Sequence, residues 1–244
     1  WFYSNDRTQP VRAVNDVTFS INKREVLGLV GESGSGKSTL GRSLLRLVKI
    51  TAGAINFDGI DIDRINKTDL KVLRRRMQMI FQDPYSSLNP RMTVFDTLAE
   101  PLLLHNLVDR CDVGKAVRTL MDNVGLAGAF AKKYPHEFSG GQRQRIAIGR
   151  AIATKPEFIV ADEPVSALDV TIQAQILKLL AELKEEYGIT MLFVSHDLAV
   201  IRQISDRVAV MFAGQLEEIG PTKTVFDHPQ SAYTRNLLES IPAR

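Results

Sequence analysis

A glycine-rich loop carries the clearest chemistry in this sequence, and it reads Gly31-Glu32-Ser33-Gly34-Ser35-Gly36-Lys37-Ser38. This spacing fits the pattern G-x-x-x-x-G-K-[ST], in which glycines let successive backbone N–H groups turn toward phosphate oxygens. Lys37 would then reach the β- and γ-phosphates of a nucleoside triphosphate, and the Ser38 hydroxyl would ligate Mg²⁺. The apolar run Val26–Val30 before the loop and the leucines at helical spacing after it favour this interpretation over an ordinary glycine-rich turn.

A pair of carboxylates, Asp162 and Glu163, follows the apolar run Phe158–Ala161. The run predicts a buried strand, and its carboxyl end is the edge where open α/β sheets bind ligands. Asp162 suits a Mg²⁺ ion that is held largely through water, and Glu163 could polarise the water that attacks a γ-phosphate. Two adjacent carboxylates can also cap a helix, so the acidic pair gains its meaning from the phosphate loop.

The elements around these residues alternate between strand and helix patterns, which predicts a parallel α/β sheet. The segment Ala13–Ile21 alternates apolar and polar residues and predicts a half-exposed strand, and Gly53–Gly59 resembles a hairpin arm. Between Pro84 and about Lys155 strand patterns give way to helical ones, so this stretch predicts a helical subdomain. The other expected strands are Met77–Phe81, Thr190–Val194 and Arg207–Phe212, and the other expected helices are Val94–Leu107, Val113–Val124, Gln142–Ala153 and Thr171–Tyr187.

Composition places the chain among ordinary globular proteins and gives little support for nucleic-acid binding. The 244 residues include 31 Lys and Arg against 28 Asp and Glu, so the formal net charge is only +3. Cys111 is the only cysteine, which rules out an intrachain disulfide and argues against a cysteine-based metal site. The run Arg74-Arg75-Arg76 is expected to be a solvated helix face. No stretch reaches the roughly 18 consecutive apolar residues that a membrane span needs. Because the sequence lacks a starting Met, we expect it to be a piece of a longer polypeptide.

The segment Phe138-Ser139-Gly140-Gly141-Gln142-Arg143-Gln144-Arg145 resembles the signature motif of the ABC ATPases, with Phe138 in place of the usual Leu. The resemblance covers Val14 to about Leu238. It implies a P-loop NTPase fold of class α/β, with a RecA-like parallel-sheet core, an antiparallel β subdomain and an inserted helical subdomain. One domain would span residues 1–244, with its core at 1–83 and 156–244 and the helical subdomain at about 84–155.

The resemblance also implies a head-to-tail dimer, in which each ATP lies between the phosphate loop of one subunit and the signature of the other. Gln82 is similar to the family's Q-loop glutamine, Ser166–Asp169 to its D-loop and His196 to its switch histidine. The catalytic residues would be Glu163, His196 and Lys37, and the Mg²⁺ ligands Ser38, Gln82 and Asp162. The nucleotide contacts would come from residues along the loop, the Q-loop and the signature, namely Gly31, Glu32, Ser33, Gly34, Ser35, Gly36, Lys37, Ser38, Thr39, Gln82, Ser139, Gly140, Gly141 and Gln142. The adenine would stack on Tyr3, with Phe2 as the alternative.

Finer features resemble the ATPases of oligopeptide, dipeptide and nickel importers. They are the run Phe81–Pro90, the pair His228-Pro229, the later Tyr233-Thr234-Arg235, and the helix Gly41–Leu47, which is similar to the second ATPase or to the second half of a fused double ATPase. This implies a peripheral subunit on the cytoplasmic face of the inner or plasma membrane. It would work with a second ATPase domain, as a homodimer or a heterodimer, with two permease subunits and indirectly with a solute-binding protein. The alternatives are a non-transport ABC ATPase that acts on nucleic acid or ribosomes, and a nucleotide-sensing module.

Overall fold

The computed structural model describes residues 12–240, so Tyr3 and Phe2 lie outside the described residues. Within residues 12–240 the strands form a six-stranded sheet, in the order β4-β5-β6-β1-β7-β8, and a separate two-stranded sheet, β2-β3. The strands are β1 (Val26–Val30), β2 (Asn56–Phe57), β3 (Ile60–Asp61), β4 (Met77–Ile80), β5 (Phe158–Asp162), β6 (Thr190–Val194), β7 (Arg207–Phe212) and β8 (Gln215–Pro221).

The centre of the large sheet is parallel and buried on both faces. Strand β1 pairs in parallel with β6 and β7, and β5 pairs in parallel with β4 and β6. The residues of β1 and β5 are all buried, as expected for parallel strands that helices cover on both sides. Because these strands run in the same direction, the loops that follow β1, β4, β5 and β6 meet at one edge of the sheet.

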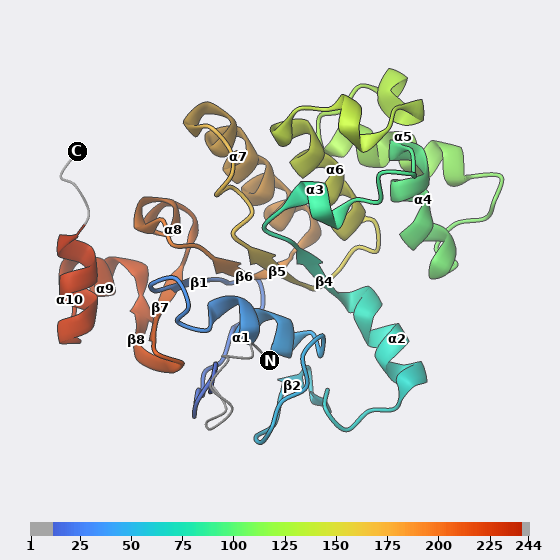
Figure 1. Cartoon of the computed structure of the whole chain (residues 1–244). Helices are drawn as coiled ribbons and strands as arrows, with labels where there is room; N and C mark the ends of the chain where they lie inside the picture. Colours follow the sequence, from blue (N-terminus) through green and yellow to red (C-terminus); the bar gives the residue numbers. More distant parts are fainter. Residues whose placement is uncertain (1–11, 241–244) are drawn as a thin grey trace, which may run out of the picture.

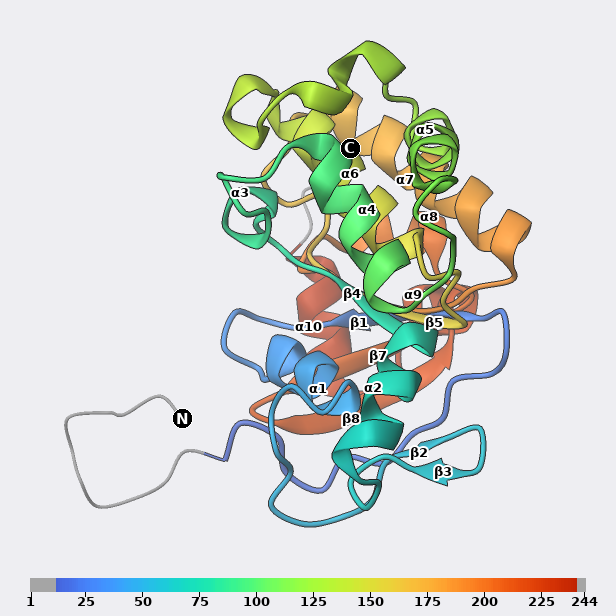
Figure 2. The same cartoon turned by 90° about the vertical axis from the view of Figure 1, so that its right-hand side faces the viewer.

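Helices cover the two faces unequally (Figures 1 and 2). Helix α1 packs on one face, where Leu40 and Leu45 join a core with Leu29 of β1 and Val160 of β5. Helices α6 and α7 lie on the other face, in a larger core that includes Ile146 of α6. The helices are α1 (Lys37–Leu44), α2 (Lys67–Arg76), α3 (Pro84–Ser87), α4 (Val94–Leu104), α5 (Val113–Asn123), α6 (Gly140–Ile152), α7 (Val170–Tyr187), α8 (Leu198–Ile204), α9 (Thr222–Asp227) and α10 (Ala232–Glu239), with two short 3₁₀ turns at Gly128–Lys132 and Pro135–Glu137.

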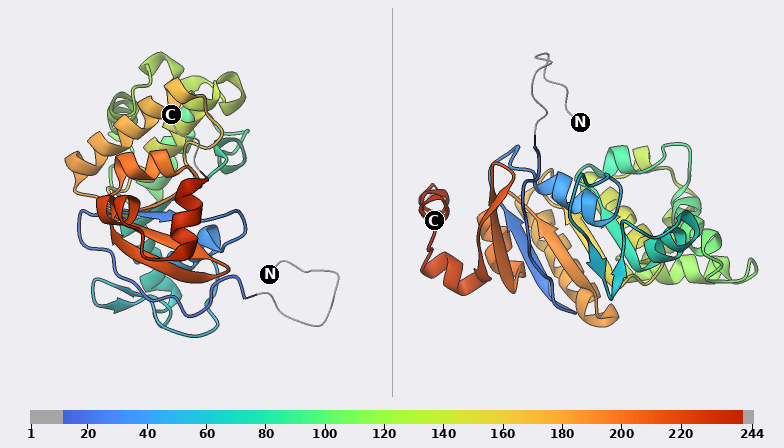
Figure 3. Two further views of the ribbon diagram at one scale, coloured as in Figure 1. Left: turned by 90° about the vertical axis from the view of Figure 1, so that its left-hand side faces the viewer. Right: turned by 90° about the horizontal axis from the view of Figure 1, so that it is seen from below.

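The segment between β4 and β5 contains no strand and holds helices α3 to α6. Its helix boundaries follow local chemistry: Thr93 caps α4 by accepting a hydrogen bond from the Asp96 N–H, while the Asp96 carboxylate accepts one from the Thr93 N–H. Seen from below, this segment lies at one end of the molecule, and β8, α9 and α10 lie at the other (Figure 3). Among the described helices, we find none that combines the length and the apolar character of a membrane span.

One expected strand does not form, and one strand that forms is not expected from the sequence. The alternation in Ala13–Ile21 predicts a strand, but the segment joins no ladder within the described residues. The alternation of apolar and polar residues still matches the burial of the side chains, because Val17, Phe19 and Ile21 are partly buried against the core around α1. An alternating pattern sets which side chains are buried, whereas a strand also needs a partner for its backbone. Conversely, the sequence pattern does not predict β8, which pairs antiparallel with β7 at the sheet edge.

Candidate nucleotide-binding site

The phosphate loop connects β1 to α1 and takes a conformation that depends on glycine. Gly31 and Gly36 have φ angles of 148° and 102°. A Cβ atom at Gly31 would collide with the backbone carbonyl of Met211, and one at Gly36 with the carbonyl of Ala13. The loop is therefore packed against backbone behind it. On its open side Gly34 has no heavy atom near the position of a Cβ, which leaves room for a ligand.

Lys37 is almost fully buried, with 6% of its surface exposed. Its ammonium group donates hydrogen bonds of 2.8 Å to the carbonyl oxygens of Gly31 and Glu32. Burial lowers the pKa of Lys37, and the nearby carboxylates of Glu163 and Asp162 oppose that shift. A cation that is held inside the loop by two carbonyls is well placed to meet the oxygens of a bound phosphate.

Asp162 and Ser38 meet at the start of α1, and their donor set suits a hard cation. The Ser38 hydroxyl donates a 2.8 Å hydrogen bond to Asp162 Oδ1. Asp162 is 1% exposed, and its other oxygen, Oδ2, has no hydrogen-bond partner among the described residues. Burial raises the pKa of Asp162, and the hydrogen bond from Ser38 opposes the shift. A buried carboxylate oxygen that accepts no hydrogen bond, beside a hydroxyl, fits Mg²⁺, which takes one or two carboxylates together with phosphate oxygens and water.

Glu163 is held by side chains from the ends of the two strands beside its own. Gln82, which follows β4, donates from Nε2 to Glu163 Oε2 over 2.9 Å. His196, which follows β6, places Nδ1 3.1 Å from the same oxygen. The Glu163 backbone has a φ of 47°, in the left-handed region, and its N–H donates to the Val194 carbonyl. The family resemblance predicts Gln82 as a Mg²⁺ ligand, and in this structure its side chain contacts the carboxylate of Glu163 rather than Asp162.

The signature lies apart from the phosphate loop. Ser139 caps α6, where its hydroxyl accepts from the Gln142 N–H and the Gln142 side chain accepts from the Ser139 N–H. Ser139 and Gly140 are exposed. Helix α6 packs on the face of the sheet opposite to α1, and none of the hydrogen bonds or ion pairs among residues 12–240 joins the signature to the loop. Within one chain, the two predicted phosphate-facing elements are therefore separate.

Comparison with known proteins identifies this arrangement. The sequence model of the family described as "ABC transporter" matches residues 14–166. The chain belongs to the ABC transporter family. The glutathione import ATP-binding protein GsiA of Pectobacterium atrosepticum is 54% identical over 238 residues, which are 98% of this chain and 38% of that protein. The chain thus spans about two fifths of the length of the curated relatives it matches.

Solved ABC cassettes share the fold as well. The ATP-binding cassette MJ0796, in a dimeric post-hydrolysis state bound to ADP and Pi, has a TM-score of 0.78 and 32% identity over 86% of this chain and 90% of that one. The protein cbiO1 from Clostridium perfringens, described as part of the ABC transporter complex cbiONQ, has a TM-score of 0.79 and 28% identity over 94% of this chain and 89% of that one. The predicted α/β fold of an ABC ATPase is therefore confirmed.

Two residues of this ABC cassette contact the site and were not predicted from the sequence. Arg42 places a guanidinium nitrogen 3.7 Å from Asp162 Oδ2. Its spacing of four from Ser38 could have indicated this, because residues four apart share a helix face. Tyr233 contacts Glu32 of the phosphate loop from 201 positions away, and no local pattern indicates such a contact.

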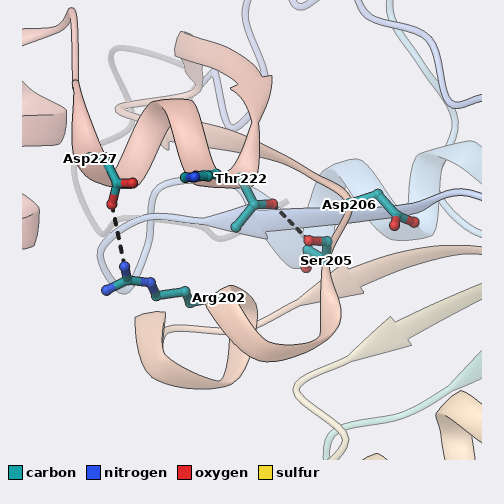
Figure 4. Close-up of a pocket in the computed structure, with 6 residues that line it drawn as sticks. Arg202, Ser205, Asp206, Thr222 and Asp227 are labelled. Atoms are coloured by element: carbon teal, nitrogen blue, oxygen red, sulfur yellow. Dashed lines mark hydrogen bonds and ion pairs between the residues drawn. The ribbon is translucent and has the colours of Figure 1, made fainter.

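A separate hollow of about 400 Å³ lies between α8 and α9 (Figure 4). It is lined by Arg202, Ser205, Asp206, Thr222, Lys223 and Asp227. Two contacts join its lining residues to one another: Arg202 pairs with Asp227 at 3.3 Å, and the Thr222 hydroxyl donates to the Ser205 carbonyl at 2.8 Å. None of the predicted site residues lines it.

Proposed function

We propose that this ABC cassette binds and hydrolyses ATP to power an importer of small peptides, and that two cassettes close around the nucleotide. The observation that carries the proposal is a divided site. The phosphate loop, Asp162 and Glu163 form one half, and Ser139 presents an exposed helix start on the other face of the sheet. An ATP molecule that contacts both halves favours the closed dimer, because it binds that state through more groups than the open one.

The residues of the chain divide the chemistry among them. The phosphate-loop N–H groups and the α1 N-terminus bind the phosphates, and Lys37 neutralises charge at the β- and γ-phosphates. Ser38 and Asp162 would hold Mg²⁺, which when bound neutralises charge that develops on the phosphate oxygens. Glu163 accepts a proton from the attacking water, while Gln82 and His196 orient its carboxylate through the contacts at 2.9 and 3.1 Å.

The peptide class rests on the 54% identity with a glutathione import protein over nearly the whole chain. Glutathione is a short peptide, and this agrees with the resemblance to oligopeptide and dipeptide importers. The working assembly in this proposal contains two cassettes and two permease subunits, and it receives solute from a binding protein outside the membrane. The cassettes lie on the cytoplasmic face, and the helical segment at 84–155 receives the permease, so that closure reaches the transport pathway.

The decisive experiment replaces the proposed base. Glu163→Gln keeps the size of the side chain but removes its ability to take a proton, so turnover should fall by about 10²–10⁴-fold. ATP binding should persist, and ATP with Mg²⁺ should trap a dimer that light scattering detects. Glu186→Gln, an exposed change near the end of α7, should leave both properties unchanged. Wild-type turnover in Glu163→Gln, or a monomer without nucleotide affinity, would contradict the proposal.

A further inference from the structure

Helix α10 contacts the phosphate loop through the side chain of Tyr233. Its hydroxyl oxygen accepts a 3.3 Å hydrogen bond from the N–H of Glu32, the second residue of the loop. The Tyr233 ring packs on Phe212 at the end of β7, with ring centroids 4.4 Å apart and planes at 37°. Burial raises the pKa of Tyr233, a shift that favours the neutral hydroxyl.

Helix α10 is itself tied to β8 at the point where it begins. Ser231 caps the helix by accepting a 3.2 Å hydrogen bond from the Tyr233 N–H. The Glu218 carboxylate of β8 accepts from the N–H groups of Gln230 and Ser231, at 2.9 and 3.1 Å. These hydrogen bonds to the start of α10 therefore restrain the position of Tyr233.

The same C-terminal region contacts the phosphate loop at two further points. The Gly214 N–H, in the turn between β7 and β8, donates a 3.0 Å hydrogen bond to the Ser35 carbonyl. The Met211 carbonyl lies so close to Gly31 that only glycine fits there. Gly31, Glu32 and Ser35 of the phosphate loop are thus each contacted by β7, by the turn after it or by α10.

We propose that Tyr233 is a positioning residue that presets the phosphate loop for nucleotide, and this rests on the proposed ATP-binding function. A loop whose N–H groups already converge loses less conformational freedom when phosphate binds. The Tyr233 hydroxyl secures the Glu32 N–H and so restrains the loop entrance. Because the restraint acts on the loop rather than on the γ-phosphate, it supports ATP and ADP binding alike.

The test is Tyr233→Phe, which keeps the ring on Phe212 and removes only the hydroxyl. One lost hydrogen bond predicts a rise of about two- to tenfold in Kd for ATP and for ADP, and a similar rise in KM for ATP. The value of kcat should stay within about twofold, because the groups around Glu163 are untouched. Calorimetric titration with each nucleotide and steady-state kinetics measure these values. Tyr187→Phe is the matched control, since it removes a hydroxyl that accepts a 2.6 Å hydrogen bond from Asn123, outside the site.

A second variant tests the route through α10. Ser231→Ala removes the cap that places Tyr233, so Kd should rise in the same direction, and the double variant should bind no more weakly than Tyr233→Phe alone. An unchanged Kd in Tyr233→Phe would overturn the positioning role, even if kcat and Tm fell. A rise in the Kd for ATP without a rise in the Kd for ADP would overturn it as well. If the wild-type chain binds neither ATP nor ADP, the proposed function fails instead.

Discussion

At the scale of single residues, Arg76 shows how a charged side chain helps to support the site. The sequence predicts Arg74 to Arg76 as a solvated face, but the guanidinium of Arg76 is directed to three partners. It donates to both oxygens of Glu157 at 2.6 and 2.9 Å and to Asp58 at 2.8 Å, and it lies over the Phe57 ring. Glu157 directly precedes β5, so Arg76 links the β2–β3 hairpin to the strand that ends in Asp162.

This contact predicts a pH-dependent loss of stability in Glu157→Gln. The hydrogen bonds from Arg76 lower the pKa of Glu157, so the pair stabilises the fold above the unfolded-state value of about 4.3. That contribution disappears as the pH falls through the lowered folded-state pKa. Glu157 is 52% exposed, so solvent screening limits the effect. We expect a loss of about 0.5–1 kcal/mol in the free energy of unfolding at pH 7.

Urea unfolding of the wild type and Glu157→Gln, at pH 7 and at successively lower pH, measures this difference. The gap between the two should narrow as the pH falls below the unfolded-state pKa. Glu182→Gln is the control, because the ion pair of Glu182 among residues 12–240 is an exposed one, with Lys178 at 3.8 Å. A gap that persists unchanged in acid would show that the charge of Glu157 is not what stabilises the fold.

The sequence predicts the arrangement of site residues that are neighbours along the chain. It does not predict contacts between site residues that only the fold brings together. Gly31 to Ser38 form one local turn, so their spacing alone is enough to define their chemistry. Gln82, Glu163 and His196 are each predictable, but their meeting at one carboxylate oxygen depends on β4, β5 and β6 being neighbours. The contact between Tyr233 and Glu32 has no local signal at all, because a tyrosine in a surface helix usually indicates packing.

At the scale of elements, the fit between α1 and β5 places Ser38 beside Asp162. A Cβ at Gly41 of α1 would lie 2.9 Å from Cγ1 of Val160, so glycine allows the helix to sit close to the strand. Three residues before Gly41, Ser38 reaches Asp162, which is two residues after Val160. The spacing of helix and strand therefore controls the hydroxyl and the carboxylate that would hold Mg²⁺.

Gly41→Ala should consequently destabilise the fold, although alanine favours helix. The stiff Val160 side chain leaves little room for adjustment, so we expect a loss of about 1–3 kcal/mol in the free energy of unfolding and weaker Mg²⁺-dependent ATP binding. Adding Val160→Ala should restore part of the ATP affinity by reopening space. Thermal unfolding and nucleotide titration with and without Mg²⁺ measure the two effects.

Gly114→Ala in α5 is the matched control for Gly41→Ala. Gly114 has open space around the position of a Cβ, so the same substitution should stabilise the fold by up to about 1 kcal/mol through helix propensity alone. Equal effects of the two substitutions would show that contact with β5 does not constrain α1.

Element types were predictable from the sequence where burial and local pattern agree. Strand β1 is apolar throughout and fully buried, and α4 to α6 carry apolar positions at helical spacing. The segment Ala13–Ile21 has the alternation of a strand but no ladder, because pairing depends on a neighbour that the segment itself does not encode. Strand β8 was not predicted for the complementary reason, since its position at the sheet edge leaves it partly exposed and without a strong apolar pattern.

At the scale of the whole molecule, the sheet separates two elements that the same nucleotide is proposed to need. The phosphate loop and α1 lie on one face, and the Ser139 cap of α6 lies on the other. In the proposed two-fold dimer each composite site would take the loop of one chain and the signature of its partner. A defect in the loop of one chain and a defect in the signature of the other would then fall in the same site and leave the second site intact.

This geometry predicts complementation between two inactive variants. Lys37→Ala removes the phosphate-loop cation, and Ser139→Asp keeps a good helix cap while placing negative charge against the γ-phosphate. Each variant alone should hydrolyse ATP at about 1% of the wild-type rate or less, since each dimer has two damaged sites. In an equal mixture half of the dimers combine the two chains, so hydrolysis should recover to about one quarter of the wild-type rate if each site works independently.

Ser139→Asn, a neutral cap, is the control for the added charge and should retain more activity alone. If differently tagged chains co-purify as mixed dimers and the mixture stays as inactive as its components, the nucleotide is not shared between the loop of one chain and the signature of the other.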